Sequence, residues 1–341
     1  MLTILKTLAI GVTGGWLATL LHLPSPWLLG AMLAVLLAIA ARVDVRMPSM
    51  TTSIISLFLG VSIASGIDAD IVDHLVDWSS TLLLMTLMLA VLVAMLFSFY
   101  RYRCRWSDTD AVLSSVPGNL AVVMLFAVQA GLDVKRIALV HSVRLFFLVT
   151  ALPLAFPITQ RSTEELVQLQ PDYPLLALVF ACAFVGGWCA RRLRIPAGML
   201  TGALFTTLVL KFLFGLDLHI PPQWFNGVLA VLGTAIAVRM AGLDLALLRN
   251  TFMGALGGLA LALTTCGCFA MVLHLGFDVP LLQALLSYMP GGIEVMVAIA
   301  FSTDVDPVFV ATHQLVRVLV MCFALPLLFR WVAGPSLKAS S

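Results

Sequence analysis

Apolar residues fall into twelve long runs along the chain, and short polar or proline-containing stretches separate them. In the first part of the chain the runs cover residues 4–21, 27–41, 50–66, 79–100, 111–130 and 137–157. In the second part they cover residues 174–190, 197–214, 224–241, 251–273, 280–300 and 308–329. A helix of about 20 apolar residues spans a bilayer, and shorter runs suit short or broken spans. The pattern therefore predicts an all-α polytopic membrane protein.

Composition and charge support this prediction. Hydrophobic residues make up 61% of the chain and charged residues only 11%, whereas a soluble domain carries about 25% charged residues. The mean hydropathy is +1.08. The formal net charge is only +2, so a nucleic-acid partner has no electrostatic support. We expect the lipid bilayer to surround the protein.

The two parts of the chain repeat one another. Corresponding residues lie 172 apart near the start of each part and 173 apart further on. So constant a register indicates an internal duplication. The matching pairs include Gly14 and Gly186, Gly60 and Gly233, Ser114 and Ser287, Pro117 and Pro290, and Arg144 and Arg317. We assign residues 1–157 and 174–333 to two membrane repeats, 158–173 to a polar linker and 334–341 to a cytoplasmic tail.

Positively charged residues predict that the repeats are inverted. Short cytoplasmic loops collect lysine and arginine. If the arginines between 101 and 105 lie inside, the run 79–100 crosses inward. The three runs before it alternate in direction, so the first run, 4–21, points outward. The arginines between 191 and 194 directly follow the matching run of the second repeat, so that run points inward. We therefore expect five crossings in each repeat, with both termini cytoplasmic, in the bacterial inner membrane.

This topology requires the fifth run of each repeat to be a re-entrant hairpin, although a broken helix that fully crosses is the alternative. Both runs contain a Pro-Gly interruption. Unpaired backbone inside a bilayer is tolerated only against protein or a water-filled cavity, and transporters with inverted repeats place substrate sites at such breaks. The competing interpretation is a simple kink or tight turn. The candidate substrate-binding residues here are Ser114, Pro117, Gly118, Asn119, Ser287, Pro290, Gly291 and Gly292.

One arginine stands within the last apolar run of each repeat, Arg144 in the first and Arg317 in the second. A charge at the bilayer centre costs roughly 2.5–3.5 kcal/mol or more, and such residues usually face a bundle interior or a cavity. Two guanidinium groups near the broken helices would suit an anion such as a carboxylate. Alternatively, these arginines bind backbone carbonyls at a helix break, or their side chains extend to the membrane surface.

Three other polar residues lie in the same apolar runs. Glu294 follows Pro290 by four residues, and either carries protons or neutralises Arg317. His141 and His313 precede the two arginines and are further candidates for proton coupling, with a buried, hydrogen-bonded structural role as the alternative.

No metal or cofactor is expected. The six cysteines have no zinc-ligand spacing and lie mostly inside apolar runs, so we interpret them as small core residues. No phosphate-binding loop, nucleophile elbow or Glu-x-x-His pair is present in the sequence. An enzymatic activity is therefore not expected.

The chain resembles the AbrB-type membrane protein family of bacteria over nearly its whole length. The motifs that carry the resemblance are Gly-Gly-Trp at 14–16 and 186–188, Leu-Leu-Gly-Ala at 28–31, Ser-x-x-Pro-Gly at 114–118 and 287–291, and Val-Arg-Leu-Phe at 143–146. Asn119 departs from the family's second glycine. Family members carry labels for an ammonia monooxygenase or for a regulator of gene expression, and the visible residues include no metal-ligand set for the first.

These observations lead to one functional hypothesis and one alternative. We expect a secondary transporter, with proton coupling as one form, for a small anionic or polar metabolite such as an organic anion. The alternative is an inner-membrane protein that regulates gene expression through sensing or through a partner. A homodimer is left open.

Overall fold

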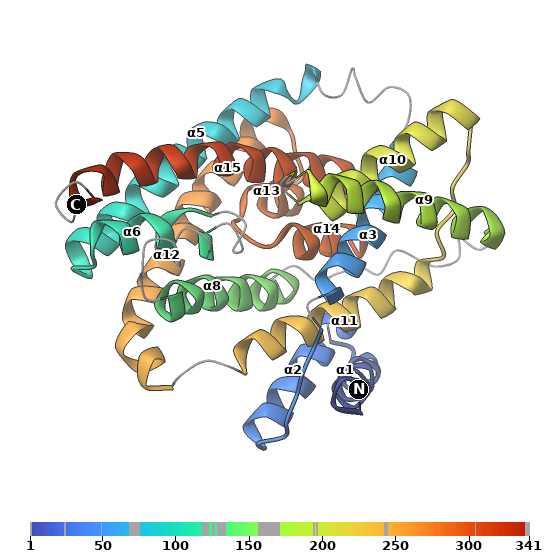
Figure 1. Cartoon of the computed structure of the whole chain (residues 1–341), viewed down its shortest axis with the longest axis horizontal. Helices are drawn as coiled ribbons and strands as arrows, with labels where there is room; N and C mark the ends of the chain where they lie inside the picture. The colour runs from blue at the N-terminus through green and yellow to red at the C-terminus, as the bar shows by residue number, and fades with distance from the viewer. Residues whose placement is uncertain are drawn as a thin grey trace. The chain divides into compact units, whose positions relative to one another are not determined.

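The computed structural model describes residues 2–23, 25–48, 50–67, 76–117, 123–124, 127, 134–155, 171–193, 195, 197–241, 245–303 and 305–337. Every regular element among these residues is helical, which confirms the predicted all-α class (Figure 1). Most helices begin and end within a few residues of an expected apolar run. The fifth run of the second repeat instead forms two short helices, α13 and α14.

The first repeat contains α1 (Leu2–Leu20), α2 (Pro26–Ala40), α3 (Met50–Ser65), α5 (Ser79–Ser98), the π-helix η1 (Phe99–Arg103), α6 (Asp108–Ser115) and α8 (Val134–Ala155). The second contains α9 (Tyr173–Arg192), α10 (Gly198–Phe214), α11 (Pro222–Met240), α12 (Leu245–Phe277), α13 (Leu281–Tyr288), α14 (Ile293–Phe301) and α15 (Pro307–Leu337).

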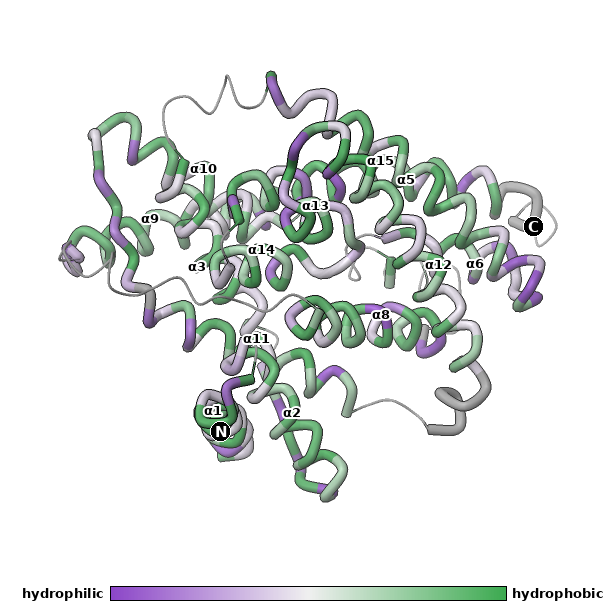
Figure 2. Tube along the Cα trace, turned by 180° about the vertical axis from the view of Figure 1, so that it is seen from behind, coloured by the Kyte–Doolittle hydropathy of each residue, from purple (hydrophilic) through white to green (hydrophobic). Residues whose placement is uncertain are grey.

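Six of the described helical stretches are long and apolar enough to cross a membrane, so the chain is a multi-pass membrane protein. They are Leu2–Leu20, Ser79–Arg103, Lys135–Ala155, Tyr173–Arg192, Thr251–Phe277 and Pro307–Val332. The helices α2, α3 and α10 are apolar but shorter. Figure 2 shows mostly apolar residues along α5, α12 and α15, as a lipid-embedded helix requires.

The chain forms two compact units, and each unit takes segments from both repeats. Unit 1 comprises Met1–His74, Val149–Gly242 and Glu294–Ala311, and unit 2 comprises Leu75–Leu148, Leu243–Ile293 and Thr312–Ser341. The first three helices of each repeat thus belong to unit 1. The fourth helix, the start of the interrupted run and most of the last helix belong to unit 2. This division cuts across the two repeats.

Glycine contacts in unit 1 follow the duplication. In the first repeat α1 packs on α2, and in the second α9 packs on α10. A Cβ atom on Gly14 would lie 2.5 Å from the carbonyl oxygen of Gly30, and one on Gly202 would lie 2.5 Å from that of Gly186. Only a residue without a side chain permits such close helix approach. Corresponding helix pairs therefore use corresponding contacts.

Unit 1 also joins the repeats to each other. Helix α3 packs against α10, and the equivalent helix α11 packs against α2. Gly60 on α3 lies against the backbone of Leu200 on α10, while Gly233 on α11 lies against the backbone of Leu28 on α2. The third helix of each repeat thus packs against the second helix of the other repeat.

Candidate functional site

The Pro-Gly sequence of the second repeat interrupts a helix. Helix α13 ends at Tyr288, Met289 is extended with φ −68° and ψ 140°, and α14 starts at Ile293. The two helices have 8 and 9 residues. At 1.5 Å per residue each is roughly 12–14 Å long, too short to span a bilayer core of about 30 Å. The predicted break is therefore present, and the carbonyl groups at its start need other donors.

Arg317 and Gln314, one turn apart on α15, supply those donors. Arg317 donates from Nη1 to the carbonyl oxygen of Met289 and from Nη2 to that of Gly291, both at 2.6 Å. Gln314 Nε2 donates to the carbonyl oxygen of Leu286 at 2.5 Å. Arg317 is 2% exposed and Gln314 is fully buried. These contacts agree with one of the two roles considered for Arg317 as alternatives to anion binding, namely that it binds backbone carbonyls at a helix break.

A second set of hydrogen bonds ties α13 and α15 to α5. The Tyr288 hydroxyl donates to the carbonyl oxygen of Thr81 at 2.6 Å. The Thr81 hydroxyl donates to the carbonyl oxygen of Trp78, so it accepts from His313 Nε2 at 2.9 Å. All of these side chains except Trp78 are buried, and His313 therefore has a structural contact in unit 2.

The interrupted run of the first repeat begins in the same way. Helix α6 ends at Ser115, and Val116 is extended with φ −73° and ψ 116°, as Met289 is in the second repeat. The Ser114 hydroxyl is buried without a hydrogen-bond partner among the described residues. Its counterpart Ser287 donates to the carbonyl oxygen of Gln283 at 2.7 Å. Pro117 follows the helix end, whereas Gly118 and Asn119 lie outside the described residues.

His141 and Arg144 lie together on α8 beside this helix end. His141 Nε2 donates to the carbonyl oxygen of Leu113 at 3.1 Å, so its Nδ1 accepts from Arg144 Nη2 at 2.7 Å. This arrangement uses a neutral imidazole. Arg144 is only 7% exposed and forms no ion pair within the described part of the chain.

The two repeats share one of these contacts at equivalent positions. The bond from His141 to Leu113 in the first repeat corresponds to the bond from Gln314 to Leu286 in the second, since both pairs are shifted by 173 residues. In both, a side chain of the last helix satisfies a carbonyl near the end of the short helix.

Glu294 lies in unit 1, in the first turn of α14. Its Oε1 accepts a hydrogen bond from the Ser56 hydroxyl at 3.0 Å. An acidic side chain in the first turn of a helix is favoured by the helix dipole. The structure therefore places Glu294 next to a hydroxyl of α3.

Sequence reasoning did not select Gln314, Thr81 or Tyr288 as site residues. Gln314 could have been found from its position 173 residues after His141, because both occupy the same place in the duplication. Thr81 and Tyr288 are far apart in sequence, and only folding brings them together. No group of three or more metal-binding side chains occurs in the part of the chain that the structure covers.

Comparison with known proteins gives the same family as the sequence motifs. A family model described as "Transition state regulatory protein AbrB" matches residues 27–333. The chain is 26% identical over 351 residues to "Putative regulator AbrB" of Escherichia coli (strain K12), covering 99% of this chain and 98% of that protein. It is 23% identical over 365 residues to "Uncharacterized protein YhjN" of Bacillus subtilis (strain 168), covering 95% and 91%. No solved structure matches the chain. Because the family model covers most of the residues, this multi-pass membrane protein belongs to the AbrB family.

Proposed function

We propose that the protein is a secondary transporter for a small anionic or polar metabolite. The observation that carries the proposal is the buried guanidinium of Arg144, whose hydrogen bond goes to a neutral ring nitrogen and which has no ion pair within the described residues. A buried charge is costly unless it is paired. A transported anion would supply the missing negative charge for as long as it is bound.

The interrupted helices support the same proposal. Arg317 brings a second buried cation into unit 2, bound to the carbonyls of the break at 289–292. Broken helices near the middle of the membrane are typical of substrate sites in transporters. In this proposal Ser114, Pro117, Gly118 and Asn119 of the first repeat, and Ser287, Pro290, Gly291 and Gly292 of the second, line the substrate path.

We also propose that the protein lies in the inner membrane as two inverted repeats of five crossings, each with a re-entrant or broken fifth segment. This topology places both termini in the cytoplasm. The arginine distribution supports this map. In this topology the substrate path could open to each side of the membrane in turn. We propose no enzymatic activity, and a homodimer is compatible with the scheme.

Glu294 is the proposed proton carrier, with His141 and His313 as further candidates. The Ser56 hydroxyl already bonds to the Glu294 carboxyl, so the side chain has a defined position. Glu294→Gln keeps an oxygen that accepts from Ser56 and removes the ionisable proton. In this variant an imposed pH gradient should no longer drive accumulation, while exchange of solute across the membrane continues.

Regulation of gene expression is the second candidate function. The name of the Escherichia coli relative favours it. Transport of a metabolite accounts for such an effect indirectly, because a changed metabolite concentration alters gene expression without contact with nucleic acid.

Uptake into proteoliposomes tests transport directly. Purified full-length protein is reconstituted and screened with radiolabelled mono-, di- and tricarboxylates. We expect uptake of at least one anion by the wild type, and a loss of about tenfold or more in Arg144→Gln, which corresponds to about 1.4 kcal/mol of lost interaction.

Arg192→Gln is the matched control, because Arg192 is exposed and lies over the Trp188 ring. It should transport as the wild type does. Circular dichroism and gel filtration establish that each variant is folded. Equal uptake by Arg144→Gln and wild type would remove the anion site from the proposal.

A further inference from the structure

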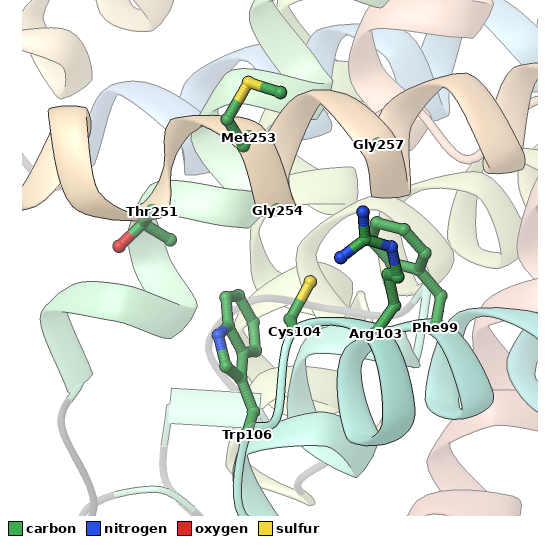
Figure 3. A pocket seen from close by; sticks show the side chains of 8 residues that line it. All are labelled: Phe99, Arg103, Cys104, Trp106, Thr251, Met253, Gly254 and Gly257. Carbon is green, nitrogen blue, oxygen red and sulfur yellow. The ribbon is translucent and has the colours of Figure 1, made fainter.

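A cavity of about 390 Å³ lies within unit 2, where η1 and the residues that follow it face residues 251–257 of α12 (Figure 3). Its lining residues are Phe99, Arg103, Cys104, Trp106, Thr251, Met253, Gly254 and Gly257. The cavity shares no residue with the Arg144 and Arg317 sites described above. A volume of this size suits a small ligand.

Two irregular backbone features gather the lining residues. The π-helix η1 widens the last turn of α5, and the Cys104 N–H donates to the carbonyl oxygen of Phe99, five residues back, at 3.1 Å. Arg105 then adopts a left-handed conformation with φ 57°, which turns the chain so that Trp106 stacks on Tyr100 at 4.6 Å between ring centroids. Left-handed backbone at a non-glycine residue costs about 1–3 kcal/mol, and π-turns and strained residues occur frequently at functional sites.

Glycines on α12 form the opposite wall. A Cβ atom on Gly254 would lie 3.1 Å from Trp106 Cζ2 and 3.4 Å from Cys104 Sγ. Gly257 lies against the ring of Phe99. Figure 3 shows the Cys104 thiol directed toward this glycine face. A Cβ atom on Gly257 would clash with Phe99 Cζ, so glycine at this position allows the two walls to come into contact.

Among the charged side chains around the cavity, Arg103 is available to bind a ligand. Arg101 pairs with Asp108, and Arg136 lies 3.6 Å from the carboxylate of Asp110, with its guanidinium over the Trp106 ring. The two nearby carboxylates, Asp108 and Asp110, thus pair with arginines other than Arg103. Arg103 forms no hydrogen bond or ion pair with the described residues, and its side chain lines the cavity (Figure 3).

We propose that this cavity binds an amphiphilic anion, a phosphate- or carboxylate-bearing molecule with an apolar part. The acidic oxygens bind the guanidinium of Arg103, which matches such groups with two parallel hydrogen bonds. The apolar part contacts the rings of Phe99 and Trp106 and the glycine face of α12. The same chemistry occurs in an anionic phospholipid and in a soluble aromatic phosphate. The site is independent of the proposed transport site.

Protection of Cys104 from alkylation tests the proposal. Full-length protein reacts with N-ethylmaleimide, and mass spectrometry of the peptide that contains Cys104 gives the rate at this residue alone. Phenyl phosphate is added to detergent-purified protein in one arm. The other arm compares nanodiscs of phosphatidylglycerol with nanodiscs of phosphatidylcholine. We expect alkylation of Cys104 to slow by about threefold or more in at least one arm, since a ligand at twice its Kd leaves about a third of the sites open.

Three variants make the result specific. Arg103→Gln should abolish the protection, and Gly254→Ala should weaken it by narrowing the cavity without a change in charge. Arg101→Gln, whose guanidinium pairs with Asp108, should keep it. Protection by phenyl phosphate identifies a soluble anion as a ligand, and protection only by phosphatidylglycerol identifies a lipid. Absence of protection in both arms, or equal protection in Arg103→Gln, would overturn the proposal.

Discussion

The guanidinium of Arg317 lies 2.6 Å from the carbonyl oxygen of Gly291, so a charged side chain of α15 satisfies the backbone of a break located 26 residues earlier. The same group binds Met289. In a bilayer, water is scarce and carbonyl groups at a helix break need protein donors. Arg317 therefore stabilises the interrupted backbone by satisfying two of its carbonyl groups.

Replacing Arg317 should reduce stability as well as transport. In Arg317→Gln the shorter side chain cannot reach both carbonyls, and each buried group left without a donor costs about 1–3 kcal/mol. We expect a lower midpoint of thermal unfolding in detergent than for Arg192→Gln. An unchanged midpoint would show that the carbonyls of Met289 and Gly291 do not depend on this side chain.

The equivalence of His141 and Gln314 allows an exchange test. Both side chains donate from Nε2 to a carbonyl near the end of a short helix. His141→Gln should therefore keep the bond to Leu113 and most of the stability. His141→Leu has nearly the same volume but no donor, and should lower the free energy of unfolding by about 1–3 kcal/mol. If the two variants have the same free energy of unfolding, the bond to Leu113 contributes little to stability.

Much of the fold was predictable because lipid imposes strong constraints on sequence. A run such as 50–66 contains no charged residue, and its helix Met50–Ser65 follows almost directly. The duplication predicted two equivalent breaks, and α6 and α13 end at equivalent residues with the same extended backbone. The ends of these helices, and the position of Arg317 beside the break of the second repeat, were therefore accessible from sequence.

Contacts between distant segments were not accessible in this way. Tyr288 reaches the carbonyl of Thr81 across 207 residues, and no sequence pattern links the two positions. The division of each repeat between two compact units also has no local signal, because it depends on how whole helices pack. The cavity beside Arg103 depends on a π-turn and on a left-handed arginine, which propensities do not reveal.

Close helix crossings in unit 1 should make Gly233 sensitive to even a methyl group. Gly233 on α11 lies against the carbonyl oxygen of Leu28, whereas nothing lies within 4 Å of a Cβ atom on Gly227 of the same helix. Gly233→Ala should destabilise the protein by about 1–3 kcal/mol through overpacking. Gly227→Ala should be neutral or stabilising by up to about 1 kcal/mol, because alanine favours the helix. Thermal unfolding of both variants gives the comparison, and equal midpoints would contradict the crossing.

Alkylation of Cys104 should depend on pH in a defined direction. Burial raises the pKa of the Cys104 thiol above its ordinary value, and the nearby Arg103 guanidinium lowers it. Only the thiolate reacts, so the rate should increase with pH and reach half its maximum above the ordinary cysteine pKa. Arg103→Gln removes the lowering influence and should move this midpoint to still higher pH, while Arg101→Gln serves as the control. A midpoint that moves down in Arg103→Gln would contradict the assigned cause.

The inverted topology makes a prediction about two positions that lie far apart in sequence. Cys104 is native, and Arg192→Cys introduces a thiol at an exposed position at the end of α9. Inverted repeats place both on the cytoplasmic side. A membrane-impermeant maleimide should therefore label both in inside-out vesicles and neither in intact spheroplasts.

Asp77→Cys provides the opposite reference, because the run 79–100 separates Asp77 from the cytoplasmic arginines between 101 and 105, and Asp77 is exposed. This position should react in spheroplasts. Parallel repeats of six crossings would instead place position 192 on the outer side together with position 77, while Cys104 stayed inside. The arginines near 103 and 192 would then face opposite compartments, and the charge asymmetry that orients short loops would be satisfied in only one repeat.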